Sequence, residues 1–265
     1  MRCSLRVRYG VLLVALTLLL VQPLFAEQRV GVGAYHFPPY AVKPESASPG
    51  GLLPELLAAL NQLQGDYRFE LVATSVTRRY RDLESGRFDL IMFESPSWGW
   101  QGIEHSALDL KIEDAEVYVA RNEAGRDQRY FDQLKGKRMA LYSGYHYGFA
   151  DFNADKQFLA EHYDAVLTYS HDSNLIMLLR GRADIAVITR SYLQLYRDRH
   201  PERSSALLVS ERVDQTYQHH ALFRPHAPLG PDQFERLLQT LNKQDQLSPL
   251  LRRYHLVGAL QAQVD

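Results

Sequence analysis

Aromatic side chains gather beside two prolines near the start of the chain. The segment GVGAYHFPPYAV (31–42) places Tyr35, Phe37 and Tyr40 where an apolar strand meets the prolines. Proline lacks a backbone N–H donor, so a central strand cannot continue through it. The rings either pack between helices or form one wall of a site, and we expect all three to contact a ligand.

A carboxylate and the chain's two tryptophans follow another apolar run. FESPSWGW (93–100) contains Glu94, Ser95, Trp98 and Trp100. Exposed tryptophans in a loop are typical of binding sites, although packing against the opposite lobe is the alternative. A carboxylate beside such rings favours a cationic group, because each cation–π contact contributes about 0.5–2 kcal/mol. We expect these four residues to line the site, with helix capping as the alternative role of Glu94.

The segment YSGYHYG (142–148) is predicted to join a strand to a helix. Backbone N–H groups at a helix N-terminus favour an anion, and Ser143 adds a hydroxyl. We therefore expect Ser143, Gly144 and Tyr145 to contact the ligand.

Two further strand ends carry polar residues. His171 lies in the turn SHDSN (170–174), where a helix cap by Asp172 or Ser173 is the alternative to ligand contact. Thr189 and Arg190 end a later apolar strand. Arg190 either anchors an anion or pairs with the hinge, and we include His171, Thr189 and Arg190 among the ligand-binding residues.

Several kinds of chemistry find no support in the sequence. His219 and His220 are adjacent, so on a strand they face opposite sides, and the other histidines lack a close chelating spacing. Neither a serine nucleophile elbow nor a phosphate-binding P-loop is present. We expect no metal and no cofactor.

The elements that position these residues alternate between strands and helices. An amphipathic helix is indicated by apolar residues at 52, 53, 56, 57, 60 and 63. Alternation of strand and helix predicts a parallel α/β sheet with right-handed crossovers, and the pattern restarts near residue 118. The predicted strands are 29–35, 68–74, 88–95, 164–170 and 183–190, and the segment 134–144 is predicted to be a turn followed by a strand. The predicted helices are 52–65, 78–86, 149–162 and 173–182, followed by two helices within 230–256.

Six segments in order resemble the bacterial extracellular solute-binding proteins of family 3, periplasmic receptors best known for polar amino acids. The segments are FPPYAV, GGLLPELLAALNQL, RRYRDLESGRFDLIM, LKGKRMALYSGYHYG, LLRGRADIAVITRSYLQLY and LLRRYHL. The resemblance implies an α/β fold of the type II periplasmic-binding-protein class: two lobes, each a mixed, mostly parallel sheet flanked by helices, joined by two hinge strands. We expect residues 27–115 and 216–265 to form lobe 1 and residues 116–215 to form lobe 2, with crossovers near 110–118 and 212–222.

The resemblance fails at the two charged anchors for an α-amino acid. The arginine that holds the ligand carboxylate in such receptors falls at Gln101, and the acid that holds the ammonium group falls at Thr189. A neutral amide poorly replaces a guanidinium facing a carboxylate. We expect a small polar or charged ligand that is not held by the usual Arg/Asp pair.

The first 26 residues predict export. Arg2, Arg6 and Arg8 precede the apolar run 11–21, which is shorter than the roughly 20 residues that span a bilayer, and Ala26 offers a cleavage site. The only cysteine, Cys3, lies in this leader. Removing its three arginines lowers the formal charge from −1 to −4, and no basic run indicates a nucleic-acid partner. We expect a periplasmic monomer.

Three classes of function remain open. The resemblance implies a binding protein that presents its ligand to an inner-membrane ABC permease. A sensory or accessory protein without a transport role is the second class. The third is an enzyme, because cyclohexadienyl dehydratases share the family fold, and Glu94 is then the candidate general acid. We expect the chain not to be an enzyme.

Overall fold

The computed structural model describes residues 27–256 of the 265-residue chain. The predicted leader and Cys3 lie outside the described residues. None of the described helices is long and apolar enough to cross a membrane.

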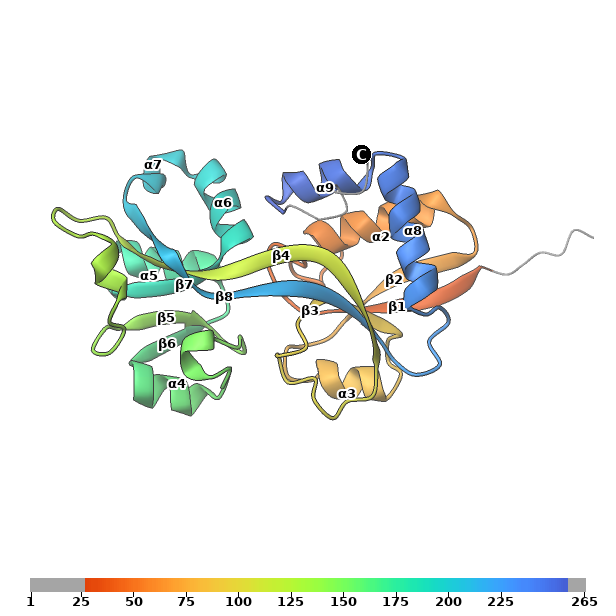
Figure 1. Cartoon of the computed structure of the whole chain (residues 1–265), viewed down its shortest axis with the longest axis horizontal. Helices are drawn as coiled ribbons and strands as arrows, with labels where there is room; N and C mark the ends of the chain where they lie inside the picture. The colour runs from red at the N-terminus through yellow and green to blue at the C-terminus, as the bar shows by residue number, and fades with distance from the viewer. Residues whose placement is uncertain (1–26, 257–265) are drawn as a thin grey trace, which may run out of the picture.

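The first lobe is an α/β unit whose parallel strands begin the chain. It contains β1 (Gln28–Ala34), β2 (Tyr67–Ala73) and β3 (Leu90–Glu94), with β1 between the other two. The helices α2 (Leu52–Leu63), α8 (Pro231–Lys243) and α9 (Leu247–Arg253) lie on the face opposite α3 (Arg79–Glu84) (Figure 1). The predicted apolar stripe of α2 is buried at Leu52, Leu53, Leu56, Leu57 and Leu60.

The second lobe repeats this arrangement. Its strands are β5 (Met139–Tyr142), β6 (Ala165–Thr168) and β7 (Ile185–Thr189), and both neighbours of β5 run parallel to it. Its helices are α4 (Lys156–Tyr163), α5 (His171–Leu179), α6 (Arg190–Arg199) and α7 (Pro201–Ser204), with short 3-10 helices at Gln128–Phe131 and Gly148–Ala150. In Figure 1, α4 lies below the sheet, and α6 and α7 lie above it.

Two long antiparallel strands connect the lobes. The strands β4 (Ser106–Arg121) and β8 (Leu207–Phe223) pair along most of their length and run through both lobes (Figure 1). They complete one sheet of order β2-β1-β3-β8-β4-β7-β5-β6. The sheet is mixed, because β8 is antiparallel to β3 and β4 is antiparallel to β7. The predicted two-lobed α/β fold, with mixed and mostly parallel strands joined by two hinge strands, is therefore confirmed. The antiparallel neighbours are the two connecting strands, which the alternation of strands and helices alone does not reveal.

Some element boundaries differ from the prediction. The helix predicted over 149–162 begins only at Lys156, because Asp155 caps it by accepting a hydrogen bond from the Phe158 N–H at 2.8 Å. The cap of α5 is Ser170, whose hydroxyl accepts from the Ser173 N–H at 3.2 Å, rather than Asp172 or Ser173. The helix α6 was not predicted.

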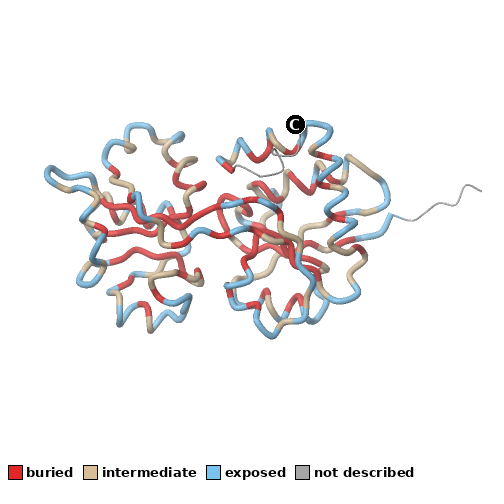
Figure 2. Tube along the Cα trace, viewed as in Figure 1, coloured by how far each residue is buried: buried red, intermediate tan, exposed pale blue. Residues whose placement is uncertain are grey.

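The lobes pack closely against each other. Figure 2 shows buried residues continuing along the central strands from one lobe into the other. Buried side chains of both lobes form one cluster that includes Phe37 and Trp98 from the first lobe and Tyr142 and Tyr145 from the second. The strand ends where polar residues were predicted therefore meet in a closed arrangement.

Candidate functional site

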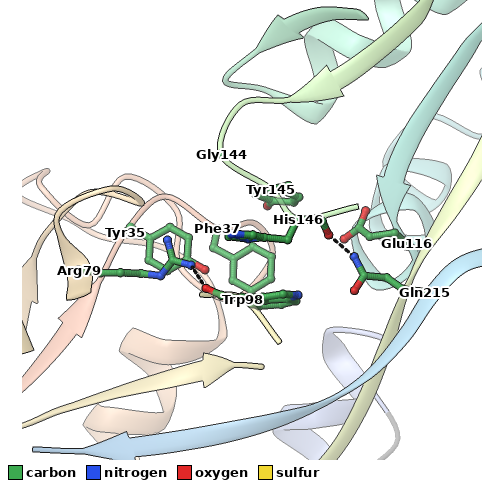
Figure 3. A pocket seen from close by; sticks show the side chains of 9 residues that line it. All are labelled: Tyr35, Phe37, Arg79, Trp98, Glu116, Gly144, Tyr145, His146 and Gln215. Atoms are coloured by element: carbon green, nitrogen blue, oxygen red, sulfur yellow. Dashed lines mark hydrogen bonds between the residues drawn. The ribbon is translucent and has the colours of Figure 1, made fainter. Parts of the chain in front are cut away.

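A small cavity lies where the two lobes and the connecting strands meet. Its volume is about 20 Å³, and it is lined by Tyr35, Phe37, Arg79, Trp98, Glu116, Gly144, Tyr145, His146 and Gln215 (Figure 3). We call this the central cavity. A water molecule needs roughly 10–15 Å³ of such space, so the central cavity has room for one group of that size.

Aromatic rings of both lobes enclose the central cavity. The Phe37 ring lies edge-on to the Trp98 ring at 5.8 Å and to the Tyr145 ring at 5.4 Å between centroids. The Trp98 ring also contacts the Tyr217 ring at 4.8 Å. Because Phe37 and Tyr145 come from opposite lobes, this ring contact joins the two lobes.

Arg79 and Glu94 form a buried ion pair on the first-lobe side. Arg79 Nε lies 3.2 Å from Glu94 Oε1, and both side chains are at most 2% exposed. Trp100 Nε1 donates to Glu94 Oε2 at 2.8 Å. The Arg79 guanidinium also lies over the Tyr35 and Tyr80 rings, at 5.0 and 4.3 Å. Burial raises the pKa of Glu94, and the Arg79 guanidinium limits that rise because it stabilises the charged carboxylate.

Glu116, on β4, is a buried carboxylate without a cationic partner among the described residues. Its Oε1 accepts hydrogen bonds from the Thr189 hydroxyl at 2.9 Å and the Tyr217 hydroxyl at 3.1 Å. Its Oε2 has no hydrogen-bond partner in the part of the chain that the structure describes, although the side chain is buried and lines the central cavity. Burial raises the pKa of Glu116 well above its ordinary value. An unpaired buried acceptor is costly, so this oxygen is a position where a bound group would be stabilised.

Tyr40 contacts the connecting strand β4 and does not line the central cavity. Its hydroxyl donates to Asp114 on β4 at 2.5 Å, and the Ser191 hydroxyl donates to the same oxygen at 2.5 Å. Arg190 Nε lies 3.9 Å from Asp114 Oδ1, and Arg190 Nη2 lies 3.4 Å from Glu113 Oε1. The structure therefore places Tyr40 and Arg190 against the connecting strand.

Two larger, open grooves are also lined by residues of both lobes. One has a volume of about 570 Å³, and we call it the serine–lysine groove; it is lined by Ser75, Val76, Thr77, Arg79, Tyr80, Ser143, Gly144, His146, Ala154, Asp155, Lys156 and Tyr169. The other, the histidine groove, has about 610 Å³ and includes His36, His171, Arg199 and Arg253. Arg79, Gly144 and His146 line both the serine–lysine groove and the central cavity, so these two spaces adjoin at those residues.

The predicted site residues divide into three groups. Five line the central cavity: Tyr35, Phe37, Trp98, Gly144 and Tyr145. Ser143 lines the serine–lysine groove and His171 lines the histidine groove, while Thr189 contacts Glu116 behind the central cavity. The remaining five do not line these three spaces: Tyr40, Glu94, Ser95, Trp100 and Arg190.

Two local expectations are wrong. Trp98 and Trp100 are 7% and 1% exposed, because the loop folds back over Arg79 and Glu94. The segment after β5 does not begin an α-helix whose N–H groups are open to an anion. The Gly148 and Phe149 N–H groups donate instead to the Asp214 carboxylate at 2.7 and 2.9 Å.

Sequence reasoning missed four residues of the central cavity: Arg79, Glu116, His146 and Gln215. Arg79 lies in a charged segment that reads as a solvated helix, so nothing local marked it. Glu116 interrupts the apolar run AEVYVA of β4, and that interruption was the available signal. Within residues 27–256 there is no group of three or more metal-ligating side chains.

Solved structures share this fold. The chain is similar to an ABC uptake transporter substrate-binding protein from Streptococcus pneumoniae with bound histidine, with 18% identity, a TM-score of 0.67, and coverage of 85% of this chain and 92% of that one. It is similar to the GluR0 ligand-binding core from Nostoc punctiforme in complex with L-glutamate, with 15% identity, a TM-score of 0.65, and coverage of 85% and 98%. It also resembles a histidine kinase sensor domain with similarity to periplasmic binding proteins, with 20% identity, a TM-score of 0.66, and coverage of 88% and 99%.

Sequence comparison gives a family. No curated protein sequence matches the chain significantly. A family model described as "ABC transporter, phosphonate, periplasmic substrate-binding protein" matches residues 55–265, which is most of the chain. The chain therefore belongs to this family of periplasmic substrate-binding proteins.

Proposed function

We propose that this protein captures a small polar or charged solute between its two lobes, which open and close about β4 and β8. The observation that carries the proposal is the central cavity, where buried polar atoms without partners come from both lobes and from the connecting strand. The cavity is sealed by rings of both lobes, so a solute enters when the lobes separate. Preferential binding to the closed form then drives closure.

The solute is not an α-amino acid held by the arginine and acid of the family 3 receptors. Gln101 is exposed, and its amide donates to the Pro96 carbonyl of its own loop at 3.0 Å. The Thr189 hydroxyl is buried and donates to Glu116. Neither position offers a charge to the two ends of an amino acid.

The family description makes phosphonates the first class of solute to test. The serine–lysine groove is compatible with an anionic group, because it presents Ser75, Thr77, Ser143 and the Lys156 ammonium group. Its volume exceeds that of the central cavity, so it would hold the larger part of such a solute.

We propose uptake with an inner-membrane ABC permease as the setting, with a monomeric, exported protein cleaved near Ala26. The likeness to a sensor domain keeps a sensory role as the alternative. An ancestral amino acid-binding protein described as a precursor of cyclohexadienyl dehydratase also has this fold, with 17% identity and a TM-score of 0.62. Glu94 does not line the central cavity and is held by the ion pair with Arg79 and the bond from Trp100, so we favour binding over catalysis.

The test is a ligand screen on protein unfolded and refolded to remove co-purified solute. Thermal shift against phosphonates, amines, organic acids, amino acids and peptides identifies binders, because a ligand specific for the folded state raises the melting temperature. Small-angle X-ray scattering then tests whether a binder shifts the protein toward the closed form. If no compound in the panel binds, the proposed function is wrong. Turnover of prephenate by the wild type would favour the enzyme alternative.

A further inference from the structure

Within residues 27–256, no cationic side chain pairs with the carboxylate of Glu116. The cationic residue that lines the same cavity, Arg79, is paired with Glu94. Two nearby histidines are neutral, because burial lowers the pKa of His146 to about 4 and that of His171 to about 3. Among the described residues, further titratable groups that influence Glu116 or line the same cavity are acidic or phenolic: Tyr35, Asp114, Asp214, Tyr145, Tyr147 and Tyr217.

The surroundings of Glu116 suit a cation. Rings of Phe37, Trp98 and Tyr145 line the cavity it faces (Figure 3), and ring faces attract positive charge. The Tyr145 hydroxyl is buried and has no hydrogen-bond partner among the described residues, so the cavity that Glu116 Oε2 lines has a second free acceptor. A buried carboxylate is stable only when it is protonated or paired with a cation. Closure without a solute therefore favours the protonated carboxyl, and closure on a cation favours the ion pair.

The size of the central cavity selects among cations. A volume of about 20 Å³ matches a group as small as one water molecule. A primary ammonium group is this compact and donates three hydrogen bonds, whereas a guanidinium or a quaternary ammonium group is larger. The remainder of the molecule would extend past Gly144 and His146 into the serine–lysine groove.

We propose that the solute carries a primary ammonium group, which enters the central cavity, pairs with Glu116, contacts Tyr145 and lies among the rings of Phe37 and Trp98. This inference rests on the proposed function and narrows its ligand class. It assigns the specificity for charge to the connecting strand β4 and not to the strand-end position of Thr189.

The test compares probes of matched shape with and without the amine. Three pairs are titrated by calorimetry near neutral pH: 3-aminopropylphosphonate with butylphosphonate, 4-aminobutyrate with pentanoate, and 1,4-diaminobutane with 1,4-butanediol. At least one amine should bind about 30-fold or more tightly than its partner, the scale expected for a buried charged hydrogen bond. Glu116→Gln should reduce that preference to within about 3-fold, because its amide keeps the shape and removes the charge.

The control variant is Glu113→Gln. Glu113 is on the same strand but is exposed and does not line the central cavity, so this change has the same effect on net charge and should leave the preference intact. Circular dichroism verifies that each variant is folded. If Glu116→Gln does not fold, Tyr145→Phe carries the test, because it removes the second free acceptor and should weaken the amine selectively.

A second readout is independent of affinity. At a pH low enough for Glu116 to be protonated in the free protein, calorimetry in buffers of different ionisation enthalpy should detect a proton released when an amine binds to the wild type and to Glu113→Gln, and none for Glu116→Gln. The proposal is overturned if a panel solute binds and amines have no advantage, or if the advantage survives in Glu116→Gln. It is also overturned if Tyr145→Phe weakens the two members of a pair equally. Absence of any binder in the wider panel would instead refute the proposed function and this inference with it.

Discussion

Gly144 offers a direct test of whether the close packing of the lobes controls ligand capture. Its φ is +86°, and a Cβ at this position would lie 2.6 Å from Val76 Cγ1, across the interface between the lobes. The other Val76 methyl would be 3.1 Å away and Val76 Cβ 3.4 Å away. Rotating the valine therefore exchanges one overlap for another. Ordinary contact begins at 3.4 Å, so Gly144→Ala forces the lobes or the loop to shift by most of an ångström.

The cost divides into two parts. Positive φ costs an alanine about 1–2 kcal/mol whether the lobes are open or closed, provided that the loop keeps its conformation. The overlap with Val76 adds about 1–3 kcal/mol, as overpacking typically does, and this part applies only to the closed form. We therefore expect Gly144→Ala to weaken binding of any identified solute about 5- to 150-fold.

The assay combines calorimetric affinity, small-angle scattering of the lobe arrangement and chemical unfolding. Val76→Ala is the matched partner, because it removes both methyl groups that meet the new Cβ. In the Val76→Ala background, Gly144→Ala should lower the free energy of unfolding but should no longer weaken binding beyond about 3-fold. Wild-type affinity and closure in Gly144→Ala alone would refute the reasoning, as would an equal loss of affinity in both backgrounds.

Three further predictions follow from the buried charges and rings. Burial raises the pKa of Glu116 above its ordinary 4.5, so the folded protein holds the Glu116 proton more tightly than the unfolded chain does. The stability that this proton contributes is fully present below about pH 4.5 and is lost as the pH rises to the folded-state pKa. Over that pH range, urea unfolding should show wild-type stability falling relative to Glu116→Gln by up to about 1.4 kcal/mol per pH unit. Arg79→Met leaves Glu94 buried without its cation and should lower the free energy of unfolding by about 3–5 kcal/mol, whereas Arg79→Met combined with Glu94→Leu should be markedly less harmful; a double variant as unstable as the single one would contradict the ion-pair account. Trp100→Phe removes a donor from Glu94 and should destabilise the fold by about 1–3 kcal/mol. This is more than the effect of Trp98→Phe, because Trp98 Nε1 has no hydrogen-bond partner within residues 27–256; the reverse order in urea unfolding would show that ring packing dominates.

The sequence predicted most of the elements because their signals are local. The amphipathic stripe of α2 has a helical period, and β3 and β7 are continuous apolar runs; burial requires both kinds of pattern. The long extent of β4 and β8 was harder to see, since each strand passes from one lobe to the other. Alternation of strands and helices indicates parallel strands and carries no information about an inserted antiparallel strand, so the mixed sheet was expected only from the family resemblance.

The candidate site divides in the same way. The sequence alone located the strand ends with Tyr35, Phe37 and Trp98, and it showed that the usual amino-acid anchors are missing. Only the tertiary structure decided that Arg79 pairs with Glu94. The Glu94 carboxylate, which was predicted to contact the ligand, therefore pairs within the protein. The tertiary structure also decided that Glu116 has a free oxygen facing the cavity. Local sequence fixes which residues are helical, extended or apolar, but the pairing of two charges depends on atoms that only the packing of separate segments brings within a few ångströms.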